Sequence, residues 1–395
     1  MIIYNIMNFV YSILFFISLY IIFIIWLRIK HPYWSKQPVY HRHKIIYKFY
    51  HPGIVNKNPI EKDRYVDTEN IDFSTFETIE EISKKLSDFL KDNYHNNEYV
   101  TYIPSPESIK AYYISQSSKS YISFLKHNVI NYKEKSLDVE EKPVIIGCMS
   151  SRPIVILTNN NKLDVQLVDN LCLNTKYRGN RKVPTIIQSH RYFTENTTKK
   201  YQKYFFKNEN NQHFNIVPFC KVNCMLFDIF TWKKPLQLYQ EKILQISDIT
   251  SNMIIDIIFN SSFKNKAYLD VFTLRQLILS NEIYAYCLVT PNKTLGTYIF
   301  KKSNTVYKNE TVFECICSIK NCENNLFAKG FHHAINMCCI KYKHRYLVIE
   351  NTSNNNVIVN TITKSKDYIY NYEVYYYFYN YITPQVKPND TLLLI

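Results

Sequence analysis

The chain has 395 residues, with 48 Lys and Arg against 33 Asp and Glu, which gives a formal net charge of +15 at pH 7. This length allows two domains with sizeable cores, and the basic surplus favours an anionic partner such as a polyphosphate or an anionic membrane surface. The sequence contains no zinc-finger spacing, RNA-recognition signature or basic leucine-zipper heptads, which counts against a nucleic-acid partner.

The first element along the chain is an apolar run. Residues 6–27 contain no charged side chain, and at about 1.5 Å per residue a helix of this length spans the ~30 Å hydrocarbon core of a bilayer. Basic residues follow the run and none precedes it, so the positive-inside bias places the rest of the chain in the cytosol. The alternative is a cleaved signal peptide, which needs a basic start and a small-residue cleavage site that the run lacks. We therefore predict a single-pass membrane anchor over residues 1–30.

The next elements are an arm, two helices and a hairpin. Residues 31–59 are polar, aromatic and spaced by prolines, which is typical of an extended arm. Residues 78–90 place apolar side chains at helical spacing. Ser105-Pro106-Glu107 supplies an N-cap, a first-turn proline and a first-turn acid for a second helix. Residues 143–157 and 163–173 predict two strands joined by an Asn-rich turn.

A basic turn follows the second of these strands. It reads Arg178-Gly179-Asn180-Arg181-Lys182, and a helix-compatible segment begins at Val183. A strand that ends in a Gly-containing turn and opens a helix leaves backbone N–H groups unpaired at the end where the helix dipole favours negative charge. The Arg and Lys side chains add donors suited to phosphate. The turn therefore predicts a cradle for a pyrophosphate, with an ordinary solvated basic turn as the alternative.

The second half repeats the order of elements. Residues 214–230 predict a strand, and residues 241–259 are mixed and join the two parts of the chain. Three strands over residues 283–289, 295–300 and 312–319 precede a helix over residues 331–340 and a strand over residues 346–350. The chain ends in an aromatic strand, residues 374–381, and an apolar tail, residues 392–395. Strands, then a helix, then strands in each half predict a duplicated α+β unit.

The cysteines are candidate ligands for a metal ion. Ten are present, and Cys315, Cys317 and Cys322 precede His332-His333 and Cys338-Cys339. Tetrahedral zinc sites usually carry paired Cys-x2-Cys spacing, which these residues lack. We therefore predict no metal, and free thiols in a reducing compartment.

Several segments in order resemble the eukaryotic glycylpeptide N-myristoyltransferase (N-tetradecanoyltransferase) family, which is two fused copies of the GNAT acyltransferase fold. The segments are Tyr33-Trp34-Ser35-Lys36-Gln37-Pro38-Val39, Asn58-Pro59-Ile60-Glu61, Tyr94 with Ser105-Pro106-Glu107, Gly147 with Pro153, the stretch with Leu171, Cys172, Lys176, Arg178, Arg181 and Pro184, and Tyr376-Tyr377-Phe378-Tyr379-Asn380-Tyr381. The resemblance implies an α+β fold of two fused GNAT-like units, over residues 31–240 for acyl-CoA and 241–395 for the peptide, behind an N-terminal transmembrane helix.

The implied activity is transfer of a myristoyl group from myristoyl-CoA to the α-amine of an N-terminal glycine of protein substrates, with no permanently bound cofactor. In such a site the backbone amides of Asn170 and Leu171 stabilise the oxyanion, the carboxylate of Ile395 is the base, and Asp169 stands beside them. The implied acyl-CoA contacts are Tyr33, Trp34, Leu171, Cys172, Arg178, Gly179, Asn180, Arg181, Lys182 and Val183. The implied peptide contacts are Tyr94, Tyr102, Gln212, Asp228 and Asn371.

The chain also departs from the family's pattern. Asp169 replaces an Asn that helps hold the terminal carboxylate, and two like charges repel unless they share a proton. Gln212 falls where the family has Thr, Asp228 falls near its His, and Tyr370-Asn371-Tyr372 replaces a Gly-rich loop. Two alternatives therefore stay open: a GNAT-type acyltransferase with another acyl donor or amine, and a catalytically inactive, membrane-anchored family member.

Overall fold

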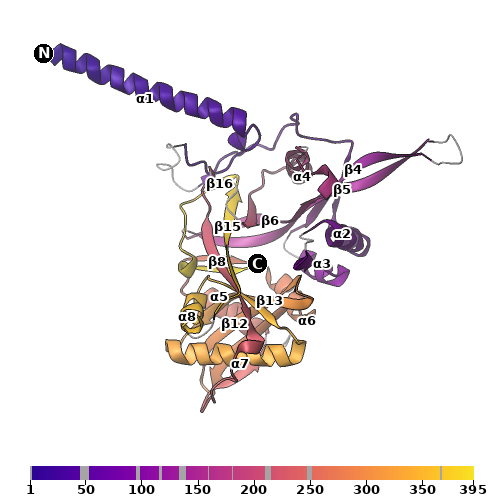
Figure 1. Cartoon of the computed structure of the whole chain (residues 1–395), viewed down its shortest axis with the longest axis vertical. Helices are drawn as coiled ribbons and strands as arrows, with labels where there is room; N and C mark the ends of the chain where they lie inside the picture. Colours follow the sequence, from indigo (N-terminus) through magenta and orange to yellow (C-terminus); the bar gives the residue numbers. More distant parts are fainter. Residues whose placement is uncertain are drawn as a thin grey trace.

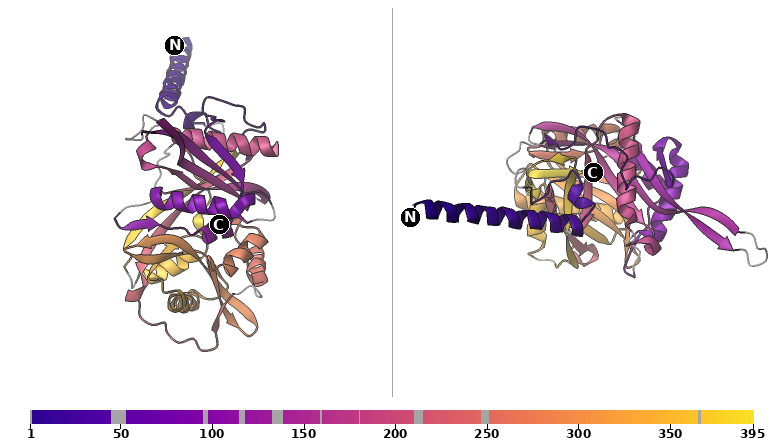
Figure 2. Two further views of the ribbon diagram at one scale, coloured as in Figure 1. Left: turned by 90° about the vertical axis from the view of Figure 1, so that its right-hand side faces the viewer. Right: turned by 90° about the horizontal axis from the view of Figure 1, so that it is seen from above.

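The structure is a computed structural model that describes residues 2–44, 53–94, 98–114, 118–132, 139–158, 160–179, 181–209, 215–246, 251–364 and 367–395. Helix α1 (Ile2–Lys30) projects from a body of mixed helices and strands (Figures 1 and 2). Residues Ile6–Lys30 are long and apolar enough to cross a membrane, and 6% of the span is buried against the body. A helix that is apolar on every side and exposed along its length is typical of a membrane segment.

The body is built on one sheet, which contains fifteen strands within the described ranges. Its main path runs β17-β10-β5-β6-β7-β15-β8-β14-β13-β12-β11-β9, while β4 and β2 continue from β5, and β3 adds to β12. Two short strands, β1 (Gly53–Ile54) and β16 (Tyr381–Ile382), pair separately. The bounds in the large sheet are β2 (Ile71–Thr75), β3 (Val100–Tyr102), β4 (Tyr121–Tyr132), β5 (Val139–Thr158), β6 (Asn161–Leu173), β7 (Tyr204–Glu209), β8 (Cys220–Asp228), β9 (Lys242–Gln245), β10 (Asn265–Tyr268), β11 (Ile283–Thr290), β12 (Lys293–Tyr307), β13 (Glu310–Lys320), β14 (Tyr346–Glu350), β15 (Tyr370–Tyr379) and β17 (Thr391–Leu394).

The duplicated α+β unit is visible in this sheet. In the first half β4 and β5 pair antiparallel, then β6 leads through α4 (Lys182–Thr198) to β7, which lies parallel to β6. In the second half β11 and β12 pair antiparallel, then β13 leads through α7 (Asn324–Tyr342) to β14, which lies parallel to β13. The halves interlock, because β15 pairs with β7 and with β8, and β8 pairs with β14.

Most of the predicted elements are confirmed. The helices over residues 78–90 and 106–113 are α2 (Ile79–Asn93) and α3 (Pro106–Tyr113), and the Ser105 hydroxyl accepts the Ser108 N–H at 3.1 Å as the N-cap. The hairpin is β5–β6, with Asn160 at φ 61° in its turn. Two predictions differ in extent: the strand over residues 214–230 is limited to β8, and the helix over residues 331–340 begins earlier, at Asn324. The remaining helices are α5 (Ser251–Asn260), α6 (Val271–Leu279) and α8 (Asn355–Ile362).

The apolar tail enters the core, as predicted. Strand β17 lies parallel to β10, which pairs with β5, and Leu392, Leu393 and Leu394 are at most 1% exposed. Full burial of each leucine is worth about 1.5–3 kcal/mol. The C terminus therefore lies in the middle of the molecule rather than on its outer surface (Figure 1).

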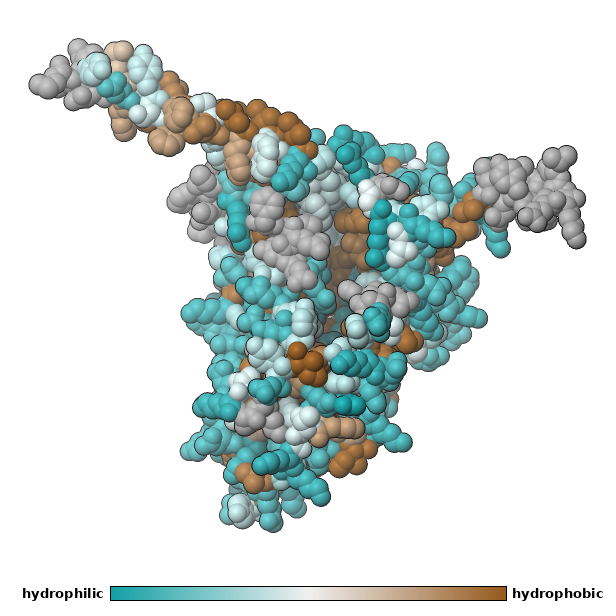
Figure 3. Space-filling model, in the orientation of Figure 1, coloured by the Kyte–Doolittle hydropathy of each residue, from teal (hydrophilic) through white to brown (hydrophobic). Residues whose placement is uncertain are grey.

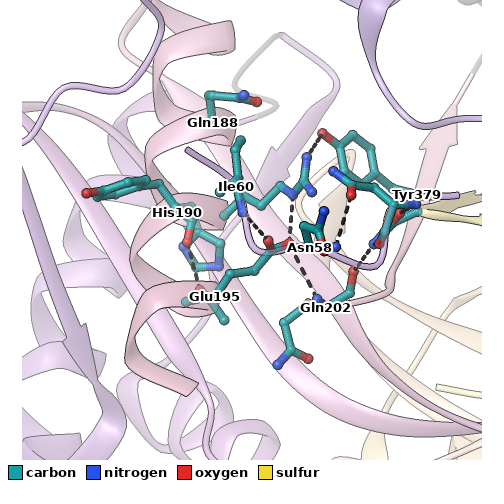
Figure 4. Close-up of polar contacts among 12 residues, drawn as sticks. Asn58, Ile60, Gln188, His190, Glu195, Gln202 and Tyr379 are labelled. Atoms are coloured by element: carbon teal, nitrogen blue, oxygen red, sulfur yellow. Dashed lines mark hydrogen bonds and ion pairs between the residues drawn. The ribbon is translucent and has the colours of Figure 1, made fainter. Parts of the chain in front are cut away.

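The N-terminal arm is fixed by polar contacts to α4 and β15 (Figure 4). Glu195 is fully buried; it accepts the Ile60 N–H at 2.9 Å and forms an ion pair with Arg191 at 2.7 Å. Arg191 also donates to the Tyr379 hydroxyl at 3.1 Å. The segment Asn58-Pro59-Ile60-Glu61 is thus held against α4 through its backbone.

His190 on the same helix makes the stability of the fold depend on pH. Its ring is fully buried between the hydroxyls of Ser123 and Ser151, at 2.8 and 2.9 Å, and burial lowers its pKa to about 3. The unfolded chain binds a proton near pH 6.5, so this contribution is complete above pH 6.5 and decreases as the pH falls toward 3. Between pH 6.5 and 5 we expect a loss of about 2 kcal/mol from this group. Urea unfolding at pH 5, 6.5 and 8 measures it, and a His190→Gln variant with the same pH slope as the wild type contradicts it.

Candidate active site

A β-bulge lies at the predicted oxyanion position. The β5–β6 pairing passes from Cys148 opposite Cys172 to Ser150 opposite Asp169, so Asn170 and Leu171 together face a single residue of β5. Asn170 has φ 51°, in the left-handed region. A bulge leaves the extra residue outside the ladder of hydrogen bonds. The bulge therefore provides the local geometry that frees main-chain groups at these two residues.

The bulge is held by a small network of side chains. The Asn170 amide donates to the hydroxyls of Tyr113 at 2.8 Å and Ser150 at 3.1 Å, and these two hydroxyls lie 2.6 Å apart. The Cys148 thiol donates to the Asn170 carbonyl at 3.2 Å. Asn tolerates the left-handed region better than other residues with a Cβ, and its amide reaches nearby groups. Asn170 is thus suited to fixing this conformation.

Asp169 has a charged partner that the sequence analysis did not identify. Its carboxylate binds the Arg152 guanidinium at 2.6 Å, and the Arg152 side chain is 3% exposed against 31% for Asp169. Burial opposes the charge on Arg152, but Asp169 raises the net pKa of the guanidinium above its ordinary value. The repulsion expected between Asp169 and the terminal carboxylate is therefore offset by a buried cation.

The terminal residue also lies beside a cation. A main-chain oxygen of Ile395, which is half-buried, accepts a hydrogen bond from the Lys301 Nζ at 3.4 Å. Lys301 Nζ lies 5.1 Å from the centre of the Tyr112 ring, and the Arg152 guanidinium lies 5.1 Å from the same ring. Asp169, Arg152, Lys301 and Ile395 therefore group around one aromatic ring, although they come from four different strands or chain ends.

The predicted peptide residues Tyr94 and Tyr102 are brought together near this group. Their rings meet edge to face with centroids 5.1 Å apart. Burial raises the pKa of Tyr94 to about 12, and the charges of Glu209 and Asp169 add to the rise. Burial also raises the pKa of Tyr102, again with a contribution from Asp169. The negative charge of Asp169, a predicted catalytic residue, thus contributes to the raised pKa of both tyrosines.

The same region contains further charged residues that keep contact with solvent. Lys207 binds Glu350 at 2.8 Å and keeps 37% of its side-chain surface exposed, while Glu350 is buried. Glu314 lies opposite Lys301 in the β12–β13 pairing and is half-buried. The space-filling view shows the surface hollowed near the middle of this face, at the level where Figure 1 places the C terminus (Figure 3). Glu314 and Lys207 thus add two charges that act on Lys301.

The basic turn has the features of an anion cradle. Gly179 and Arg181 have positive φ values of 86° and 54°. Helix α4 begins at Lys182, and the side chain of its N-cap residue, Arg181, makes no capping hydrogen bond to the described residues. Uncapped first-turn N–H groups attract anions. Arg178 also has contacts within the protein, because its guanidinium donates to the carbonyls of Asn93 at 2.7 Å and Leu173 at 3.2 Å. It ties the turn to α2 and β6, which leaves Arg181 and Lys182 as the side chains with the greater freedom.

The other predicted residues are distributed as follows. Tyr33 is buried and donates to Gln188 of α4 at 3.4 Å, and its ring meets that of Trp34 edge to face. Cys172 is buried, which raises its thiol pKa to about 11. Leu171 and Val183 are half-buried, and Asn371 is exposed on β15. Asp228 is held by Arg345 at 2.8 Å. Asn180 and Gln212 lie outside the described residues.

The cysteines do not come together with other ligands. Within the described part of the chain, no three or more His, Cys, Asp or Glu side chains are grouped so as to hold a metal ion. Cys315, Cys317 and Cys338 are buried free thiols.

No protein-family model matches the chain, and no curated protein matches it in sequence. Solved structures do match: N-myristoyltransferase of Saccharomyces cerevisiae with bound myristoyl-CoA has a TM-score of 0.70 at 8% identity, over 90% of this chain and 94% of that chain. A second structure of the yeast enzyme with bound myristoyl-CoA gives 0.71 at 9% identity, over 91% and 90%. A third, with myristoyl-CoA and inhibitors, gives 0.70 at 9% identity, over 91% and 92%. The predicted α+β fold is confirmed: the chain has the fold of the N-myristoyltransferases.

Proposed function

We propose that the protein transfers a myristoyl group from myristoyl-CoA to the α-amine of an N-terminal glycine of other proteins. The observation that carries the proposal is the convergence of Ile395, Arg152-bound Asp169 and the Asn170 bulge, in a chain with this fold. These residues are far apart in sequence, and acyl transfer to an amine requires a base, an oxyanion site and an acyl-CoA site together.

The chemistry assigns one role to each group. The substrate ammonium, with a reference pKa near ~8, gives one proton to the Ile395 carboxylate. The amine then attacks the thioester carbon, a C–N bond forms, and the N–H groups of Asn170 and Leu171 stabilise the negative oxygen. When the C–S bond breaks, the thiolate of CoA takes the second proton from nitrogen and leaves as the thiol. The carboxylate returns its proton to water.

The remaining parts of the proposal concern the rest of the chain. Residues 1–30 anchor the protein in a membrane, with the catalytic part in the cytosol. Residues 31–240 bind acyl-CoA and residues 241–395 bind the peptide and supply the base. The basic turn contacts the phosphates of CoA, because Arg181, Lys182 and the uncapped N–H groups of α4 occur together at a helix end that favours anions.

Removing the charges of this turn should weaken acyl-CoA binding. In the variant Arg181→Asn with Lys182→Ala, Asn keeps the left-handed backbone conformation while both cations are lost. A hydrogen bond to a charged group contributes about 1.5–3 kcal/mol, so we expect the Kd for myristoyl-CoA to rise by at least ~10-fold with kcat at saturation nearly unchanged. Isothermal titration calorimetry measures the Kd. Lys199→Asn with Lys200→Ala, at the other end of α4, removes the same charge, keeps the left-handed conformation of Lys199 and is the matched control; equal losses in both variants would contradict a specific phosphate site.

The activity itself is tested with the full chain in detergent micelles. Myristoyl-CoA is combined with a panel of peptides that begin with glycine, and with the same peptides carrying an acetylated N terminus. We expect release of the CoA thiol and acylated peptide only with the free glycine amine. Transfer from acetyl-CoA in preference to myristoyl-CoA supports another GNAT-type acyltransferase. Binding of myristoyl-CoA without any transfer supports an inactive family member.

A further inference from the structure

We propose that Lys301 is a positioning residue that holds the carboxylate of Ile395 in place and keeps it ionised. The catalytic meaning of this inference rests on the proposed function, but the contact itself does not. Lys301 Nζ donates to the Ile395 oxygen across a separation of 94 residues. Nothing in the motifs around Lys301 or in the resemblance points to this residue.

The place of the ammonium is fixed by its surroundings. Lys301 is on β12, next to a register irregularity in the β12–β13 pairing between Ile299 and Phe300, and it pairs with Glu314. Its Nζ lies over the face of Tyr112, where the ring attracts a cation. The tail is held from the other direction by the pairing of β17 with β10. The ammonium and the carboxylate are therefore presented to each other by two separate parts of the sheet.

The charges around Lys301 come from four strands. Glu314 on β13 and Asp169 on β6 favour its protonated form, whereas Arg152 on β5 and Lys207 on β7 disfavour it. Burial is the largest effect and lowers the pKa of Lys301. A half-buried cation is stabilised by an anion as a direct partner, and the Ile395 carboxylate supplies it.

Two other groups at the Tyr112 ring have unused hydrogen-bonding capacity. Arg152 is 3% exposed, and its Nη1 has no hydrogen-bond partner among the described residues. The Tyr112 hydroxyl is likewise buried without a partner among them. Lys301 is thus the donor that contacts the Ile395 carboxylate directly, while Arg152 and Tyr112 supply further donors around the same ring. Loss of the Lys301 charge removes the direct contact.

The consequence concerns the acid limb of the pH–rate profile. An opposite charge within about 4–6 Å lowers a carboxyl pKa by roughly 1–3 units, so removing Lys301 should raise the pKa of the terminal carboxyl by at least ~1 unit. In Lys301→Met we expect the acid limb of kcat to move up by that amount. The loss of rate should then be about tenfold at pH values below the wild-type acid limb and should disappear on the plateau above it. Lys301→Arg should keep the wild-type limb.

A second readout does not depend on activity. Carboxypeptidase is added to the folded full chain in detergent, and release of isoleucine is followed by mass spectrometry. We expect Lys301→Met to lose Ile395 several-fold faster than the wild type, and Lys301→Arg to match the wild type. Lys293→Met, an exposed lysine on the same strand, is the matched control.

The outcomes separate the two proposals. If no acyl-CoA is turned over but trimming is accelerated only in Lys301→Met, the proposed function fails and the role of Lys301 stands. If transfer is observed but Lys301→Met shows an unmoved acid limb and unchanged trimming, the inference about Lys301 is wrong. If the methionine variant does not fold, Lys301→Gln replaces it in the pH–rate profile and in the carboxypeptidase assay, because glutamine keeps a donor without the charge.

Discussion

Deletion of Ile395 should lower kcat by at least ~100-fold while myristoyl-CoA still binds. A general base contributes about 10²–10⁴-fold, and a displacement of ~1 Å can cost as much as 10²-fold. Deletion moves the carboxylate back by one residue, about 3.3 Å along the strand, and turns it away from Lys301. The basic turn, where we propose that acyl-CoA binds, is unaffected. Steady-state kinetics give kcat, and calorimetry gives the Kd for myristoyl-CoA.

Two matched variants isolate the carboxylate from the side chain. Ile395→Val keeps the carboxylate in place and removes one methylene, so its kcat should stay within a few-fold of the wild type. Addition of one glycine after Ile395 keeps every native side chain and displaces only the carboxylate, so it should be as defective as the deletion. A fully active extended chain would rule out the terminal carboxylate as the base.

Replacement of Arg191 by Met should lower the free energy of unfolding by about 3–5 kcal/mol at pH 7, because it leaves the Glu195 carboxylate buried without its cation. The Ile60 and Gln202 N–H groups still reach Glu195 but carry no full charge. Glu195 then prefers its protonated form in the folded state, so the defect should become smaller as the pH falls toward 4. Urea unfolding of the full chain in detergent measures both effects.

The double variant Arg191→Met with Glu195→Gln tests the cause. Removing both charges avoids the unpaired buried carboxylate, so the double variant should recover part of the stability lost in Arg191→Met and show no such relief at acid pH. If the single and double variants unfold at the same urea concentration at every pH, the loss comes from packing and not from the unpaired charge.

The sequence predicts the local parts of this structure well and the long-range contacts poorly. The cap at Ser105, the hairpin at Asn160 and the turn before α4 follow from residues that lie within a few positions of one another. The sequence pattern predicts the start of α7 too late, at residue 331 and not at Asn324, because Gly330 interrupts the helical pattern. That glycine is required by packing: a Cβ there would lie 2.4 Å from the Tyr298 hydroxyl.

The candidate site shows the same division. The bulge residues and the basic turn were identified from one short segment and its resemblance to a family. Arg152 and Lys301 are not indicated by the sequence, because nothing in the residues around either one reveals its partner. Their partners lie 17 and 94 residues away and are brought into contact only by the order of the strands. Predicting them requires the topology of the sheet.

The interlocking of the two halves places the C-terminal strand in one continuous sheet. Because β15 is hydrogen-bonded to β7 and β8, and β8 to β14, the halves cannot swing apart as hinged lobes without breaking these ladders. In the proposed reaction, an acceptor therefore has to reach Ile395 without the two halves opening.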